Sequence, residues 1–244
     1  MPQDDLQDRQ NMDFARPLLK ESISDGEHYG YWLAGSCFMV SQANKLFVVT
    51  AKHVANAEEA NVLRVLAAPP GREFLPISAG YSAIPADQFD SDYADVSAFE
   101  IDKSLLSPQT LEAMSILQLD DHECQGMSGI GQGSRLIIKG YPWDLNNIDT
   151  EINHINLRAF QASGRLAGDA PMQGCYSLAI DDPSSVDNLN LMSGSAIMLA
   201  PEDRQTSTRL AGMAVRGGNG HVYFVDCVRI CEFLKGTSKI AKWT

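Results

Sequence analysis

The amino-acid sequence predicts an all-β protein built from two sets of strands and ending in one helix. Short apolar runs recur along the chain and are separated by clusters of Gly, Pro, Asn and Asp, which is typical of barrels and sandwiches. A polar, glycine-rich stretch at residues 121–133 divides these runs into two sets, and we interpret it as a linker. The spacing does not fit a βαβ fold.

The first set of strands is expected over residues 31–120, after a polar and acidic N-terminal arm at residues 1–30. The arm contains only a short apolar cluster at residues 14–19, so we expect loose packing there. The strands of this set are expected at residues 33–41, 45–50, 62–67, 73–78 and 96–101. Ser107, followed by Pro108, is expected to begin a short helix.

The second set of strands and the final helix are expected over residues 134–244. Its strands are expected at residues 135–140, 157–163, 175–180, 195–200, 209–215 and 221–225. Cys227, Ile230, Cys231 and Leu234 then follow the i, i+3, i+4, i+7 spacing of an amphipathic helix.

Composition limits the classes of partner. The chain has 244 residues, of which 44% are hydrophobic, enough for a sizeable core. Its net charge of -12 would be repelled by phosphate backbones and anionic lipids, so we expect neither nucleic acid nor membrane as a partner. No apolar run approaches the roughly 20 residues of a membrane-spanning helix.

The cysteines suggest a reducing compartment. There are five, an odd and scattered number, and the N-terminus lacks the apolar segment of a signal peptide. We therefore expect reduced thiols and a cytoplasmic location, with a non-classical secretion route left open. No Cys-x-x-Cys pair is present, so no zinc site is expected, and no other metal or cofactor is implied. The cysteines are Cys37, Cys124, Cys175, Cys227 and Cys231.

Ser193 lies between Met192 and Gly194, directly before the apolar run 196–200. A tight turn leading into a buried strand can hold a hydroxyl rigidly and can aim backbone N–H groups at the place where an oxyanion forms. This stretch alone favours an ordinary turn between strands, so the functional interpretation depends on the rest of the chain.

Two further residues extend the pattern. His53 follows the apolar run 46–51, and Asp95 directly precedes the apolar run 96–101. Taken singly, a structural histidine and a solvated acid are the simpler interpretations. Together with Ser193 they give the order His, Asp, Ser, with 42 residues from His53 to Asp95 and 98 from Asp95 to Ser193 (193 − 95).

Five segments in this order resemble those of one family. They are residues 50–53 (Thr-Ala-Lys-His), 95–99 (Asp-Val-Ser-Ala-Phe), 193–196 (Ser-Gly-Ser-Ala), 210–217 (the cleft strand) and 220–223 (Gly-His-Val-Tyr). They are similar to the corresponding segments of trypsin/chymotrypsin-like serine proteases, over roughly residues 31–236. In its sequence pattern, the chain most resembles the bacterial or viral-type intracellular members of this family. The resemblance implies a chymotrypsin-like double β-barrel with a C-terminal helix.

The resemblance also implies that the protein is a serine endopeptidase, which cleaves polypeptides through an acyl-enzyme intermediate. His53 would be the general base, Asp95 would orient it, Ser193 would be the nucleophile, and the backbone N–H groups of Leu191 and Ser193 would form the oxyanion hole. The family usually has glycine where Leu191 stands. A catalytically inactive relative that serves as a binding or scaffolding module therefore remains the alternative. An esterase is less favoured because no Gly-x-Ser-x-Gly segment is present.

The resemblance places five residues around the substrate side chain that precedes the cleaved bond: Asp187, Val215, Arg216, Gly217 and His221. Of these, His221 and Arg216 favour a polar or acidic side chain over a basic one. Asp187 would favour Lys or Arg if it pointed into the pocket, and a small apolar side chain remains open if His221 only packs.

Two alternatives for the catalytic residues remain open. Ser128, in the segment 126–129 (Gly-Met-Ser-Gly), is a second candidate nucleophile. Asp92 is a second candidate for the acid that orients His53.

Overall fold

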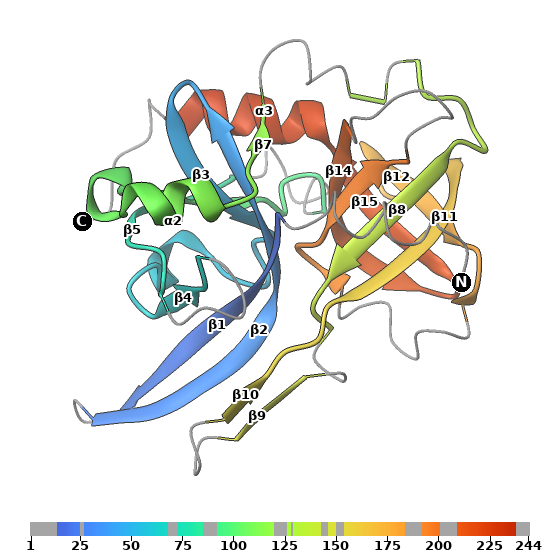
Figure 1. Ribbon diagram of the computed structural model, residues 1–244. Coiled ribbons are helices and arrows are strands. Elements are labelled where there is room, and N and C mark those ends of the chain that lie inside the picture. Colours follow the sequence, from blue (N-terminus) through green and yellow to red (C-terminus); the bar gives the residue numbers. More distant parts are fainter. Residues whose placement is uncertain are drawn as a thin grey trace.

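The computed structural model contains two β units that lie side by side, and a C-terminal helix packs against both (Figure 1). It describes residues 14–24, 27–67, 73–84, 92–119, 126–127, 129–142, 146–149, 154–183, 192–200 and 209–237. Among these residues, no helix is both long and apolar enough to cross a bilayer.

The first unit is an open seven-stranded sheet in the order β4-β1-β2-β3-β6-β5, with β7 paired to β2. Its strands are β1 (Ala15–Ser24), β2 (Glu27–Gln42), β3 (Lys45–Thr50), β4 (Leu63–Val65), β5 (Ile77–Ser82), β6 (Ser97–Ile101) and β7 (Leu117–Gln118). Ala43 and Asn44 have positive φ angles of 49° and 63° in the tight turn between β2 and β3. That conformation suits the twist of a two-residue hairpin.

In the described part of the chain, three short helices also belong to this unit. The 3₁₀ turns η1 (Ala57–Glu59) and η2 (Lys103–Leu105) follow β3 and β6. Helix α2 (Pro108–Ala113) begins at Ser107, whose side chain accepts a hydrogen bond from the backbone N–H of Thr110. The predicted cap and the proline at the first helical position are both present.

The expectation of a loose arm is wrong for residues 15–24. They form β1, which pairs along its length with β2 and also with β4. Leu18 and Leu19 are fully buried, and even Arg16 is 4% exposed. This strand could not be recognised in the sequence for two reasons. Polar residues are interspersed among its apolar ones, and a strand buried on both faces does not show simple alternation of polar and apolar residues. Residues 1–13 lie outside the described part of the chain.

The second unit is a closed six-stranded barrel in the order β11-β12-β15-β14-β13-β8. Its strands are β8 (Arg135–Gly140), β11 (Phe160–Asp169), β12 (Cys175–Ile180), β13 (Ala196–Leu199), β14 (Arg209–Gly218) and β15 (His221–Asp226). The barrel encloses a core of its own that includes Leu136, Leu178, Ile197 and Phe224. The predicted all-β class is confirmed.

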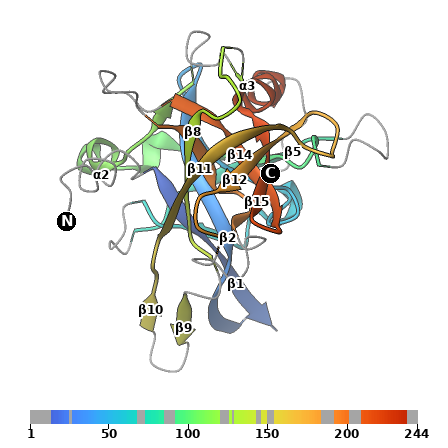
Figure 2. The same ribbon diagram turned by 90° about the vertical axis from the view of Figure 1, so that its right-hand side faces the viewer.

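A short ribbon of two strands, β9 (Asn147–Asp149) and β10 (His154–Asn156), leaves the barrel and runs beside the β1–β2 hairpin. Figures 1 and 2 show this ribbon and the hairpin projecting from the same side of the molecule.

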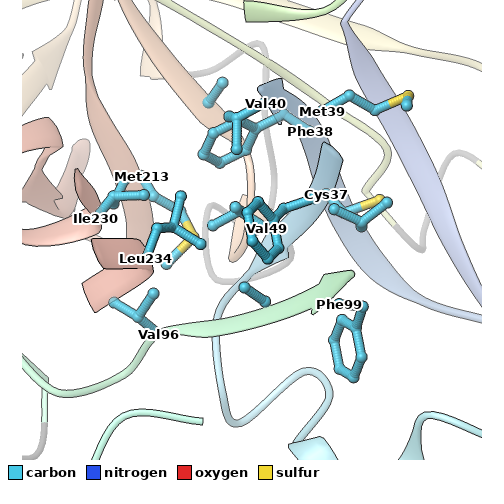
Figure 3. Packing of buried hydrophobic residues seen from close by; sticks show 14 of the residues in the cluster. Cys37, Phe38, Met39, Val40, Val49, Val96, Phe99, Met213, Ile230 and Leu234 are labelled. Carbon is cyan, nitrogen blue, oxygen red and sulfur yellow. The ribbon is translucent and has the colours of Figure 1, made fainter. Parts of the chain in front are cut away.

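Helix α3 (Cys227–Gly236) confirms the predicted amphipathic helix and joins the two units. Its buried residues Ile230 and Leu234 belong to the same hydrophobic cluster as Phe38 and Val49 of the first unit and Met213 of the barrel (Figure 3). The side chain of Asp226 caps the helix by accepting from the N–H of Arg229, at 3.1 Å. One core therefore spans both units.

The expectation of reduced thiols is wrong for Cys231, which forms a disulfide. Cys37, Cys175 and Cys227 are buried and are not disulfide-bonded. Burial raises the pKa of Cys227 to about 11, so this thiol is uncharged near neutral pH. Sequence spacing could not show the disulfide, because it depends on which segments pack against α3.

Tyr81 of β5 gives a prediction about alkaline stability. Its hydroxyl donates to Glu100 Oε2 at 2.9 Å, and burial, followed by this hydrogen bond and the charge of Glu100, raises its pKa from 10.0 to about 12. The unfolded chain therefore loses this proton at a lower pH than the folded protein, so stability falls as the pH rises from 10 towards 12. We expect Tyr81→Phe to reduce this alkaline loss, measured as urea-unfolding midpoints at pH 9 and 11.

The midpoints at pH 9, where the tyrosine is still largely protonated in both states, separate this effect from simple loss of the hydrogen bond, which is worth about 1 kcal/mol. An equal alkaline loss in Tyr81→Phe and in the parent protein would contradict the assignment.

Candidate active site

His53 and Asp95 are joined by two hydrogen bonds. The backbone N–H of His53 donates to Asp95 Oδ1 at 2.9 Å, and His53 Nδ1 lies 2.6 Å from Asp95 Oδ2. The carboxylate is 12% exposed, whereas the imidazole is 52% exposed. A carboxylate at Nδ1 favours the tautomer with its proton on that nitrogen, which leaves the lone pair on Nε2. The pair can therefore present a base to solvent or to a substrate.

The register of the first sheet explains this contact. Thr50, the last residue of β3, pairs with Ser97, the first residue of β6. His53 lies three residues after that pair along one strand, and Asp95 lies two residues before it along the other. The backbone N–H of Lys52 also donates to the carbonyl oxygen of Asp95, at 3.3 Å, which ties the two segments together.

Ser193 lies in a tight turn that leads into β13. Its hydroxyl donates to the carbonyl oxygen of Val215 at 3.2 Å, and the residue is buried. The next residue, Gly194, has a φ of +82°. A Cβ there would lie 2.1 Å from the carbonyl oxygen of Ser36 and 2.4 Å from Thr50 Oγ1, so the turn requires glycine at this position.

The Ser193 turn packs directly against the first unit near His53. The N–H of Ser36 donates to the carbonyl oxygen of Ser193 at 3.4 Å, and Thr50 Oγ1 donates to the carbonyl oxygen of Ser36 at 2.8 Å. A Cβ on Gly35 would lie 2.8 Å from the side chain of Val54, the residue after His53, and 3.6 Å from the Ser193 carbonyl oxygen. Contacts between β2 and both turns thus bring the serine and histidine segments together.

Sequence reasoning missed Gly35 and Ser36, which form this junction. Ser36 Oγ also accepts from the N–H of Tyr141, at 2.7 Å, just after β8. The available signal was a glycine inside the apolar run of β2, because such a glycine often marks the close approach of another segment.

The predicted substrate-binding residues are partly described. Val215, Arg216 and Gly217 follow one another on β14, and Val215 touches the Ser193 hydroxyl. His221 begins β15, and its Nδ1 lies 2.9 Å from Ser177 Oγ. Asp187 and Leu191 lie outside the described residues, so the roles predicted for them remain predictions.

Of the two alternative catalytic residues, Asp92 and Ser128, the structure describes only Asp92. Asp92 accepts a hydrogen bond from Arg216 Nη2 at 2.9 Å, whereas Asp95 holds both hydrogen bonds to His53, so the geometry favours Asp95 as the acid. Ser128 lies outside the described residues. Within the described part of the chain, no group of three or more His, Cys, Asp or Glu residues is arranged to hold a metal ion.

Comparisons with known proteins support the architecture. No family model matches the sequence, and neither does any curated protein. A solved structure titled "Atomic resolution structure of HBP", a heparin-binding protein with a chymotrypsin-like fold, matches with a TM-score of 0.60. The match covers 95% of this chain and 94% of that one, at 14% identity. The chain therefore has the chymotrypsin-like double β-barrel fold.

Proposed function

We propose that this protein is a serine endopeptidase whose catalytic residues are His53, Asp95 and Ser193. The observation that carries the proposal is the double hydrogen bond from His53 to the Asp95 carboxylate, through Nδ1 and through the backbone N–H. This arrangement fixes both the orientation and the tautomer of the imidazole, as a general base requires.

The proposed reaction begins with a rotation of the Ser193 side chain. Its hydroxyl turns from the Val215 carbonyl towards His53 Nε2, which takes the proton as the oxygen attacks the scissile carbonyl carbon. The tetrahedral intermediate collapses to an acyl-enzyme when His53 returns the proton to the leaving amine. Water, activated by His53, then releases the acid product and restores Ser193.

The substrate is proposed to be an extended polypeptide that lies beside β14. This strand pairs with β13 only as far as Met213 and continues to Gly218, past the Val215 carbonyl that the serine contacts. Such an extension can hydrogen-bond a peptide main chain as an added strand. The net charge of -12 argues against a polyanion such as heparin, the ligand named for the structural neighbour.

Labelling with a fluorophosphonate tests the proposal, because this reagent reacts with serines that a neighbouring base activates. We expect one adduct on the full-length chain, located at Ser193 by peptide mass spectrometry and lost in Ser193→Ala. Two control variants should keep the adduct. Ser195→Ala removes a buried hydroxyl two residues along the same turn, and Ser128→Ala removes the second candidate nucleophile.

A chain that forms no adduct would favour the inactive binding module. An adduct lost in Ser128→Ala but kept in Ser193→Ala would overturn the assignment of the nucleophile.

A further inference from the structure

The turn that carries Asp95, residues 92–95, is bound by side chains of strand β14 and of helix α3. Asp92 accepts from Arg216 of β14 at 2.9 Å, and its carboxylate is 14% exposed. Arg216 directly follows Val215, whose carbonyl oxygen contacts the Ser193 hydroxyl. This ion pair therefore links the segment of the acid to the segment that contacts the nucleophile.

Tyr93 makes a second and independent connection. The guanidinium of Arg229, in the first turn of α3, lies 4.7 Å from the centre of the Tyr93 ring. Arg229 Nε also donates to the carbonyl oxygen of Tyr93 at 3.3 Å. On another side, a Cβ on Gly174 would lie only 2.6 Å from the ring, so Tyr93 packs directly on the turn between β11 and β12.

The remaining two residues of the turn face the first unit. Ala94 is 2% exposed and belongs to the shared core, and Asp95 holds His53. The turn is therefore fixed on both sides, by its own sheet and by two arginines, one in the barrel that carries Ser193 and one in helix α3.

We propose that Arg216 and Arg229 are positioning residues, which hold the 92–95 turn, and through it Asp95 and His53, in register with Ser193. The proposal rests on the proposed function and adds residues to it. It matters because the base and the nucleophile belong to different units. A misplacement of about 1 Å between reacting groups can cost about 10²-fold in rate.

The two arginines are expected to act through different interactions, Arg216 through an ion pair and Arg229 through stacking and a hydrogen bond. Arg216 is 57% exposed, so its attraction to Asp92 is weak and is screened by salt. Arg229 acts through the planar guanidinium, which stacks on a ring and donates in its own plane, and lysine cannot reproduce this. The variant Arg216→Lys should therefore keep the positioning role of the residue, whereas Arg229→Lys should lose it.

The kinetic arm of the test uses the full chain and a peptide substrate. We expect Arg229→Met and Arg229→Lys to lower kcat by about 10- to 100-fold with little change in KM. Arg216→Ala should lower kcat by about two- to fivefold at low salt, with the difference vanishing in 1 M NaCl and with rescue by Arg216→Lys. The control Arg135→Ala removes an exposed arginine at the start of β8 and should change nothing.

A second arm does not depend on activity. In the Ser193→Ala background, the proton between His53 Nδ1 and Asp95 Oδ2 is expected to give a low-field NMR resonance. Arg229→Met should broaden or shift it, whereas Arg135→Ala should not. This arm reports on the turn even if the chain hydrolyses no peptide, so failure of the proposed function can be told apart from failure of this proposal.

Unchanged kcat and an unchanged resonance in Arg229→Met would overturn the proposal. A fall in thermal stability alone, with both of those readouts intact, would also overturn it, because it would show a structural role only.

Discussion

Ser193→Ala is expected to lower kcat for peptide hydrolysis by about 10⁶-fold, the loss typical of removing the nucleophile from a working triad. The variant keeps its fold, because the change deletes one hydroxyl from a turn whose geometry depends on Gly194 and on backbone hydrogen bonds to Ala214 and Met192. Single-turnover kinetics on a peptide substrate measure the loss, and circular dichroism checks the fold.

The matched control is Ser195→Ala. The Ser195 hydroxyl is fully buried and has no hydrogen-bond partner among the described residues, so its removal leaves none of their polar groups unpaired. Activity that survives in Ser193→Ala at more than about 1% of the parent would contradict the assignment, since the residual rate of a triad without its serine is far lower.

Asp95→Asn is expected to lower kcat by about 10⁴-fold, the effect of forcing the wrong histidine tautomer in such a triad. The amide of asparagine has the shape of the carboxylate but offers an N–H group to one of its two partners. It cannot accept from both the backbone N–H and Nδ1 of His53 unless its oxygen is shared. Kinetics at saturating substrate measure the change.

Asp92→Asn is the matched variant, three residues away on the same turn. Among the described contacts it weakens only the pair with Arg216, so its effect should stay within about fivefold. If Asp92→Asn cost as much as Asp95→Asn, or more, the roles given to these two carboxylates would be wrong.

Local sequence patterns were enough to predict much of the fold. The structure has strands over Lys45–Thr50, Arg135–Gly140 and Cys175–Ile180, the same bounds that the apolar runs indicated. The i, i+3, i+4, i+7 pattern likewise predicted α3 from Cys227 onward. These elements are short, and the pattern of apolar residues that predicts each of them lies within the element itself.

The features that depend on distant contacts could not be predicted in this way. Strand β1 is fixed by its pairing with β2 and β4, and its polar residues concealed it. Arg216 and Asp92 are 124 residues apart in the chain, so nothing in either segment indicates the other. The His53–Asp95 pair was an exception, because a resemblance of segment order, and not a local pattern, connected the two residues.

The core shared between the units has a consequence for how the protein is made. Phe38 and Val49 lie in the first half of the chain, but they pack with Ile230 and Leu234 of α3. A growing chain leaves the ribosome from its N-terminus, so the first sheet emerges with this face uncovered until residue 234 has followed. Domains that are complete can fold during synthesis. Here the apolar face of the first half stays open to aggregation or to a chaperone until α3 has been made.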